Sequence, residues 1–284
     1  MQVLLVSAGD VAIESGLRFV RQGYEVEGWR RNSSKLPAEF KGQDVDLLNP
    51  SAWPVIDEST EFVVFTPVPA ARTYEAYTRS YLEVAQELVQ RLSVQAPTLK
   101  RIIYVSSSAV SGGGDGEWID EGTEVAPNRA TSEVLAATER VFLDSGLPVT
   151  VLRASGIYGP GRNHLIDQVR DGSARMPLDS HWTNRIHRDD LAQAIVHVAT
   201  LGNASEDVYM VTDDEPAQID EIYTFLAEQL RLPIPPQATE QTVRRAANRR
   251  IRNDKLLATG FELQFPGFRE GYRSVLAGDS IRHR

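Results

Sequence analysis

MQVLLVSAGDVAIESGLRFVRQGYEVEGWRR, residues 1–31, is the stretch that decides the fold of this chain. It opens with an apolar run of strand type, residues 3–6, and continues into a turn of small residues, 7–12. Residues 13–22 have the apolar spacing of a helix, and a second strand-like run follows at 24–29. A strand, a tight turn, a helix and a second strand in this order predict the opening unit of a dinucleotide-binding fold.

The turn carries an incomplete G-x-G-x-x-G fingerprint. Its three glycine positions hold Ser7, Gly9 and Ala12. The middle glycine lets the backbone approach a pyrophosphate, and an alanine at the third position adds only a methyl group. Ser7 is the larger departure, because that turn favours a residue without a Cβ atom. The fingerprint therefore predicts either a cofactor turn or an ordinary strand–helix–strand unit without a nucleotide.

The rest of the chain divides into two parts that differ in their pattern of predicted secondary structure. Strand-like runs alternate with helical stretches up to residue 154, and six such strands predict a Rossmann-type, doubly wound parallel sheet over residues 1–154. Residues 155–284 are richer in turns and short elements, and they predict a smaller, mixed substrate-side domain in which some elements pack back on the sheet. The later strands are expected at 43–47, 62–65, 101–105, 148–153 and 208–211, and the helices at 71–94, 131–145, 189–200 and 217–230.

Composition limits the classes of function. The 284 residues include no cysteine, which excludes disulfides, thiolate metal sites and a cysteine nucleophile. The five histidines are scattered, so no metal site is predicted, and the net charge of −9 argues against a nucleic-acid partner. There is no secretory type of N-terminus and no apolar run near the ~18 residues of a membrane helix. We therefore expect a cytoplasmic monomer or homodimer that acts on a small molecule and has no membrane partner.

Three later segments resemble the extended short-chain dehydrogenase/reductases, which include the NAD(P)-dependent sugar-nucleotide epimerases and dehydratases. They are RIIYVSSSAV at 101–110, LRASGIYGPGR at 152–162 and RIHRDDLA at 185–192. Gly-Asp-Val at 9–11 and NRRIRN at 248–253 are similar to an uncharacterised bacterial subgroup of epimerase/dehydratase proteins. The resemblance covers nearly the whole chain and implies a Rossmann fold and an NAD(P) cofactor.

The resemblance also implies where the cofactor binds. Arg30 and Arg31 end the second strand, where NAD-preferring relatives place a carboxylate for the ribose hydroxyl. An arginine suits a 2′-phosphate, so NADP is predicted rather than NAD, unless both arginines are simply solvated. Asp46 matches an adenine-side contact or, equally, a turn residue. The full predicted cofactor set is Ser7, Gly9, Asp10, Val11, Arg30, Arg31, Asp46, Leu47, Thr66 and Ser106.

The catalytic set of the family is incomplete in this chain. Ser108 matches the family's hydroxyl position after the fifth strand, and the alternative is a turn serine at the strand end. The family's Tyr-x-x-x-Lys pair falls on Ala130 and Val134. No tyrosine lies between residues 104 and 158, so no shift of the alignment restores the pair. Tyr158 and His187 are the remaining titratable candidates, and each is either an acid/base group or a packed structural residue.

Several arginines are candidates for binding an anion. They are Arg153, Arg162 and Arg185, and the alternative for each is a surface or ion-paired residue. The basic run 244–252 is typical of a solvated helix face, and the alternative is a phosphate or carboxylate clamp.

Two functions remain open. The first is an NAD(P)-dependent oxidoreductase or epimerase/dehydratase that passes a hydride between the nicotinamide and a carbon bearing a hydroxyl or carbonyl, with a nucleotide-sugar-like compound as one candidate substrate. The second is a catalytically degenerate NADP-binding sensor or regulatory protein, which the missing tyrosine and lysine keep open. A variant of the first is a reductase that takes its proton from water or from His187.

Overall fold

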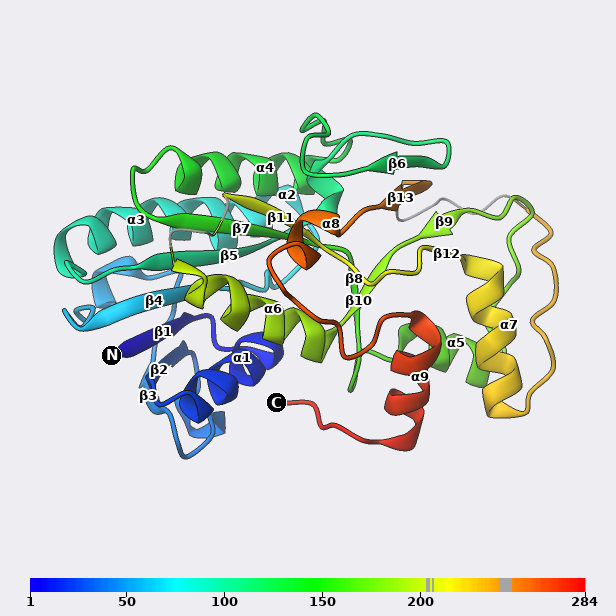
Figure 1. The fold of residues 1–284 in the computed structure, drawn as a ribbon, viewed down its shortest axis with the longest axis horizontal. Helices are drawn as coiled ribbons and strands as arrows, with labels where there is room; N and C mark the ends of the chain where they lie inside the picture. The colour runs from blue at the N-terminus through cyan, green and yellow to red at the C-terminus, as the bar shows by residue number, and fades with distance from the viewer. Residues whose placement is uncertain (203–204, 206, 241–246, 284) are drawn as a thin grey trace.

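The computed structural model describes residues 1–202, 205, 207–240 and 247–283. Across these residues, seven parallel strands form the central sheet in the order β11-β7-β5-β4-β1-β2-β3 (Figure 1). The order reverses between β1 and β4, which creates the crevice where open α/β sheets bind ligands. The predicted Rossmann-type sheet is confirmed. Its strands are β1 (Gln2–Val6), β2 (Glu25–Arg30), β3 (Lys41–Asp44), β4 (Thr60–Phe65), β5 (Arg101–Ser107), β7 (Val149–Ala154) and β11 (Val208–Val211).

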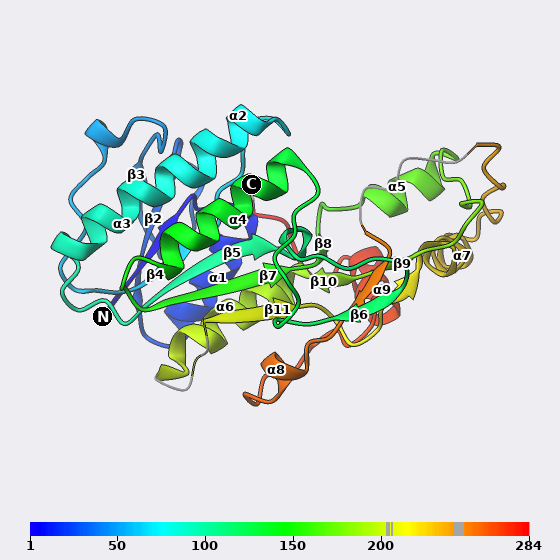
Figure 2. The ribbon, with the colours of Figure 1, turned by 90° about the horizontal axis from the view of Figure 1, so that it is seen from above.

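Helices cover both faces of the sheet (Figure 2). Alternate residues of β1 explain this, because Val3 and Leu5 pack into one apolar cluster while Leu4 and Val6 pack into another. The first cluster lies under α1 (Asp10–Arg21) and α6 (Arg188–Thr200), and the second under α3 (Val84–Gln95) and α4 (Ala130–Leu143). A strand buried on both faces accounts for the continuous apolar run that opens the sequence.

The helix predicted at 71–94 contains an irregular turn. Thr73 caps its start by accepting the N–H of Ala76. The chain then runs through α2 (Tyr74–Tyr77), a π-helical segment η3 (Thr78–Glu83) and α3. Apolar spacing predicts the helix but does not distinguish a wider turn within it.

The third strand differs from its predicted span of 43–47. It covers Lys41–Asp44 and is followed by a turn in which the Asp46 carboxylate accepts the N–H of Leu48 at 3.0 Å. The last bond to β2 is the Val45 N–H to the Arg30 carbonyl at 2.9 Å, and the turn begins after it. Asp46 and Leu47 therefore follow the strand instead of belonging to it.

The later part of the chain extends beyond the C-terminal ends of the sheet strands (Figures 1 and 2). Three of its described elements return to the sheet: β11 pairs with β7, α6 packs beside α1, and Leu256 of α8 (Asp254–Leu257) joins the same apolar cluster. A separate apolar cluster joins its helices through residues that include Ile166, Ile222 and Phe268. No helix in the described ranges is long and apolar enough to cross a membrane.

The remaining elements are short. Three small sheets pair β8 (Gly156–Tyr158) with β10 (Arg185–His187), β9 (Trp182–Thr183) with β12 (Ala217–Gln218), and β6 (Glu117–Ile119) with β13 (Arg249–Ile251). The helices are α5 (His164–Arg170), α7 (Ile219–Leu230), α8 (Asp254–Leu257) and α9 (Phe268–Ala277), and the single turns are η1 (Ser33–Lys35), η2 (Pro50–Ala52) and η4 (Ser108–Val110).

Candidate functional site

The turn after β1 leads directly into the N-terminus of α1. Ser7 has a φ of +66°, the left-handed region that favours glycine, and its carbonyl accepts the Gly9 N–H at 2.7 Å. Gly9 is the N-cap of α1 and has no side chain with which to cap the first amides of the helix. The N-terminus of α1, with Val11 in its first turn, is therefore suited to an anion.

Thr66 brings the end of β4 to the same turn. Its hydroxyl donates to the Ser7 carbonyl at 3.3 Å, so the two strands on either side of the order reversal are joined here. The structure thus places Ser7, Gly9, Val11 and Thr66 together at the C-terminal edge of the sheet.

Arg30 ends β2 with part of its guanidinium buried. Its Nη1 atom is buried and has no hydrogen-bond partner within the described residues, and burial lowers the pKa of the side chain. A buried donor without an acceptor fits a phosphate group as its partner. Arg31 is exposed. After β3, the exposed Asp46 makes the turn described above, and Leu47 packs against the second apolar cluster.

The side chain of Asp10, the first residue of α1, bonds to other parts of the protein. Its carboxylate accepts hydrogen bonds from Arg188 Nη1 at 2.8 Å and from the backbone N–H of His283 at 3.0 Å, while Arg162 Nε lies 3.4 Å away. Arg188 is completely buried, and its Nη2 also donates to the Ile281 carbonyl. The side chain of Asp10 therefore ties α1 to α6 and to the C-terminal segment.

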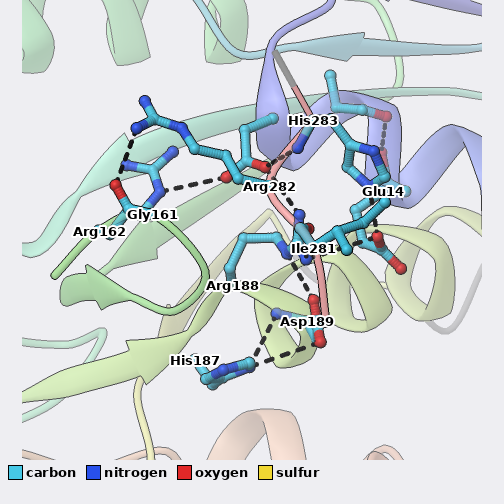
Figure 3. A network of polar contacts seen from close by, with 12 residues as sticks. Glu14, Gly161, Arg162, His187, Arg188, Asp189, Ile281, Arg282 and His283 are labelled. Carbon is cyan, nitrogen blue, oxygen red and sulfur yellow. Dashed lines mark hydrogen bonds and ion pairs between the residues drawn. The ribbon is translucent and has the colours of Figure 1, made fainter. Parts of the chain in front are cut away.

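Glu14 extends the same network by one turn of α1 (Figure 3). It interacts with the His283 ring at 2.7 Å and with Arg18. Burial acts to raise the pKa of Glu14, but the His283 hydrogen bond and the charges of Arg18 and Arg188 lower it to about 2. Sequence reasoning missed Glu14, Arg188 and His283, because no local pattern reveals that the chain end returns to α1.

Ser106 and Arg153 belong to a buried network beside α4. The Ser106 hydroxyl donates to Glu139 at 2.6 Å, and Arg153 makes contacts of 2.7 and 3.2 Å with the same carboxylate. All three residues are buried. The structure therefore pairs Arg153 with Glu139 of α4, a partner that sequence reasoning missed.

Ser108 starts the turn η4 directly after β5 and is half-buried. Ala130 is the exposed first residue of α4, and Val134 is buried one turn later. The start of α4 thus presents a methyl group to solvent and an apolar side chain to the interior.

His187 is fully buried at the start of α6. Its Nδ1 accepts the Asp189 N–H at 3.2 Å as the N-terminal cap, and its ring centroid lies 4.1 Å from that of Phe265. Burial lowers the pKa of His187 to about 4, although the Asp189 charge opposes this. The ring is neutral at pH 7 and holds the helix start.

Tyr158 lies between His187 and α9. Its ring centroid is 4.6 Å from that of Tyr272, and its hydroxyl packs against Gly271. That hydroxyl is buried and has no hydrogen-bond partner in the described part of the chain. Burial raises the pKa of Tyr158 far above its usual value, so the group remains protonated at neutral pH.

The three candidate substrate arginines occupy three different places. Arg153 faces Glu139, and Arg162 lies beside Asp10 with its side chain 33% exposed. Arg185 is buried, donates to the Thr183 hydroxyl at 2.8 Å and lies near the buried Asp213, whose pKa burial raises. They do not form one anion pocket.

The basic run that ends at residue 252 contains a strand. Arg244 and Arg245 lie outside the described residues, while Arg249–Ile251 forms β13 against β6, so the helix-face prediction is wrong for this part. Arg250 lies between the rings of Trp118 and Trp182, with centroid distances of 4.8 and 5.0 Å. A hollow of about 620 Å³ lies beside Trp118 and the loop at 112–113.

Arg249 holds the loop that follows β5. Its guanidinium donates to the carbonyl oxygens of Ser108, Ser111 and Gly112 at 2.5 to 2.6 Å, and the residue is 6% exposed. Sequence reasoning noticed the basic run but could not predict these contacts, because they join residues more than 130 positions apart.

Comparisons with known proteins identify the family and the fold. The sequence model of the NAD dependent epimerase/dehydratase family matches residues 17–211. A candidate NAD-dependent epimerase/dehydratase from Methylobacillus flagellatus is 28% identical, with a TM-score of 0.79 over 98% of both chains. No curated protein matches the chain.

Two more distant structures share the fold. A protein named MoeE5, in complex with UDP-glucose and NAD, is 21% identical with a TM-score of 0.83 over 98% of both chains. The UDP-glucuronic acid 4-epimerase from Bacillus cereus, in complex with UDP-glucuronic acid and NAD, is 17% identical with a TM-score of 0.82, again over 98% of both chains. The family match covers well over half of the sequence, and this chain belongs to the NAD-dependent epimerase/dehydratase family.

Proposed function

We propose that this protein binds NADP at the C-terminal edge of its sheet and acts as an oxidoreductase or epimerase/dehydratase on a hydroxyl- or carbonyl-bearing substrate. The observation that carries the proposal is the glycine-capped N-terminus of α1 at the reversal of strand order, joined to β4 by the Thr66–Ser7 hydrogen bond. Backbone N–H groups at the start of α1 are free of a side-chain cap and suit a pyrophosphate.

The residues of the chain have separate tasks in this proposal. The nicotinamide, when bound, supplies the hydride chemistry. Ser108 donates a hydrogen bond to the substrate oxygen, and the arrangement of β5 and η4 holds it at the sheet edge. Tyr158 and His187 are buried and stay neutral at pH 7, so they shape the site while solvent water exchanges the proton.

The substrate class is a further part of the proposal. Structures that share the fold were solved with UDP-glucose and UDP-glucuronic acid. We assign a nucleotide-sugar-like substrate to this chain on that basis, with Arg162 as the partly exposed arginine that remains open to an anionic group.

The preference for NADP rests on Arg30. The buried, unpartnered Nη1 of Arg30, so described within the residues that the structure covers, suits a 2′-phosphate, whereas the relatives with bound cofactor contain NAD. We expect Arg30→Ala to weaken NADPH binding about tenfold to hundredfold and to leave NADH binding unchanged, because charge-assisted hydrogen bonds contribute about 1.5–3 kcal/mol. Fluorescence titration of both dinucleotides measures this.

The matched control is Arg170→Ala. Arg170 is an exposed arginine of α5 paired with Asp167, so its removal changes the net charge equally without touching the sheet edge. An equal loss of NADPH and NADH affinity in Arg30→Ala would contradict the 2′-phosphate assignment. Failure of the wild-type protein to bind any dinucleotide would refute the proposed function as a whole.

The second candidate function is an NADP-binding sensor without catalysis. Ala130 and Val134 favour it, as do the pKa values of Tyr158 and His187, which lie far from neutrality. Turnover of bound NADPH or NADP⁺ with a panel of nucleotide sugars and small carbonyl compounds separates the two. Tight cofactor binding without turnover of any of them favours the sensor.

A further inference from the structure

Arg249 is a buried cation in contact with the residue that carries the candidate catalytic hydroxyl. Its Nη2 donates to the Ser108 carbonyl at 2.5 Å, and its Nη1 donates to the carbonyls of Ser111 and Gly112. These contacts fix both ends of the turn η4, in which the Ser111 N–H also bonds back to Ser108. The loop geometry around the hydroxyl thus depends on one guanidinium from β13.

The charge of this guanidinium is not neutralised by a carboxylate. Among the described residues, no aspartate or glutamate forms an ion pair with Arg249, and its hydrogen-bond acceptors are neutral carbonyl oxygens. Glu139, which accepts from Ser106, is already paired with Arg153. Glu117, the residue of β6 that pairs in register with Arg249, accepts the Gly114 N–H. A buried, unneutralised cation produces a field that water screens poorly.

The family places a lysine close to the hydroxyl group, on the helix after the fifth strand. In this chain that position holds Val134, and the tyrosine position holds Ala130. A positive charge from these positions of α4 is therefore absent, and Arg249 supplies one from β13 instead.

We propose that Arg249 is a positioning residue for Ser108: it fixes the hydroxyl at the sheet edge and stabilises negative charge there. This inference rests on the proposed function for its catalytic meaning, but the field at Ser108 exists without cofactor or substrate. The alternative is that Arg249 only holds the loop, with no electrostatic effect on residue 108.

The absence of cysteine from the chain makes the field directly measurable. Ser108→Cys introduces a single thiol at the site, and its pKa follows from the pH dependence of thiolate absorbance or of alkylation by iodoacetamide. We expect this pKa to lie at least about one unit below the ordinary value of ~8.5, because a nearby positive charge favours the thiolate. Adding Arg249→Gln should raise it by about one unit or more, since glutamine keeps a donor but removes the charge.

Two further variants separate charge from loop structure. Arg249→Lys in the Ser108→Cys background keeps the charge but loses the forked contacts, so the thiol pKa should stay low even if the loop loosens. Arg250→Gln removes an equal charge from the same strand at a guanidinium that stacks between Trp118 and Trp182, and it should leave the thiol pKa nearly unchanged.

The thiol pKa values test the role of Arg249 without a bound dinucleotide. A thiol pKa at or above ~8.5 in Ser108→Cys, or a low pKa that Arg249→Gln leaves unchanged in a folded protein, overturns the proposal. If Arg249→Gln does not fold, a high thiol pKa in Arg249→Lys has the same meaning. Because no cofactor is used, a failure of the chain to bind NADP refutes the proposed function and leaves this test intact.

Discussion

Ser7 adopts a backbone conformation that proteins normally reserve for glycine. Its φ of +66° costs roughly 1–2 kcal/mol in a residue with a Cβ atom. The conformation persists because the Ser7 carbonyl accepts from both the Gly9 N–H and the Thr66 hydroxyl. A turn that has lost the first glycine of the fingerprint can therefore keep its backbone geometry. The sequence motif alone does not reveal this.

At His187, the structure predicts a specific dependence of stability on pH. The folded-state pKa of about 4 lies below the usual 6.5, so the unfolded chain binds more protons between these values and His187 disfavours the folded state as pH falls through them. His187→Asn keeps a capping acceptor but removes the titration. We expect the advantage of wild type over this variant to shrink by about 2–3 kcal/mol between pH 6.5 and pH 4, measured by urea unfolding.

Comparing the two proteins is essential, because Asp190 titrates in the same window. Burial raises the pKa of Asp190 to about 6, which favours the folded state at low pH and opposes the effect of His187. This contribution is present in both proteins and cancels in the difference. A constant difference across the window would show that His187 is not buried in its neutral form.

Among the elements, α4 and β7 are joined by the buried pair of Glu139 and Arg153. Removing one partner leaves an unpaired buried charge, so we expect Arg153→Met to lower the free energy of unfolding by about 3–5 kcal/mol. The double variant Arg153→Met/Glu139→Leu should recover most of this loss, because neither charge then remains. Chemical denaturation of the three proteins measures both effects.

That comparison also tests the role of Arg153. If the pair only stabilises the fold, Arg153→Met should lose much of its stability. The protein that remains folded should still bind NADPH with the wild-type affinity. If Arg153→Met keeps the wild-type stability but binds a nucleotide sugar more weakly, Arg153 is a substrate-binding residue instead.

The sequence predicted the presence of helices and strands better than it predicted where they end or where a helix contains an irregular turn. Apolar runs revealed β1 and β4 because both faces of these strands are buried. The end of β3 was misplaced because Val45 and Leu47 pack against the second apolar cluster although both follow the strand. The pairing of Arg153 with Glu139 could not be predicted, because it depends on the rotation of α4 over β7 and not on any spacing in the sequence.

At the scale of the whole molecule, distant segments complete the site. The backbone positions at the ends of β1 and β4 follow from the fold class and were predictable. Arg249 reaches Ser108, and His283 reaches Asp10, from the late part of the chain. Sequence spacing carries no information on which remote segments meet, so these contacts emerged only from the structure.

The C-terminal segment is the longest of these connections and gives the final prediction. Ile281 accepts from the buried Arg188, His283 bonds to Asp10 and Glu14, and Arg282 donates to the Gly161 carbonyl (Figure 3). Deleting residues 280–284 leaves buried polar groups of α1 and α6 without these partners, which costs about 1–3 kcal/mol for such a group. We expect a lower melting temperature and faster amide hydrogen exchange in the first two turns of α1. Arg282→Ala, which removes one exposed contact, serves as the control and should change neither measurably. Unchanged exchange at the start of α1 after the deletion would show that the segment rests on the molecule without supporting the cofactor turn.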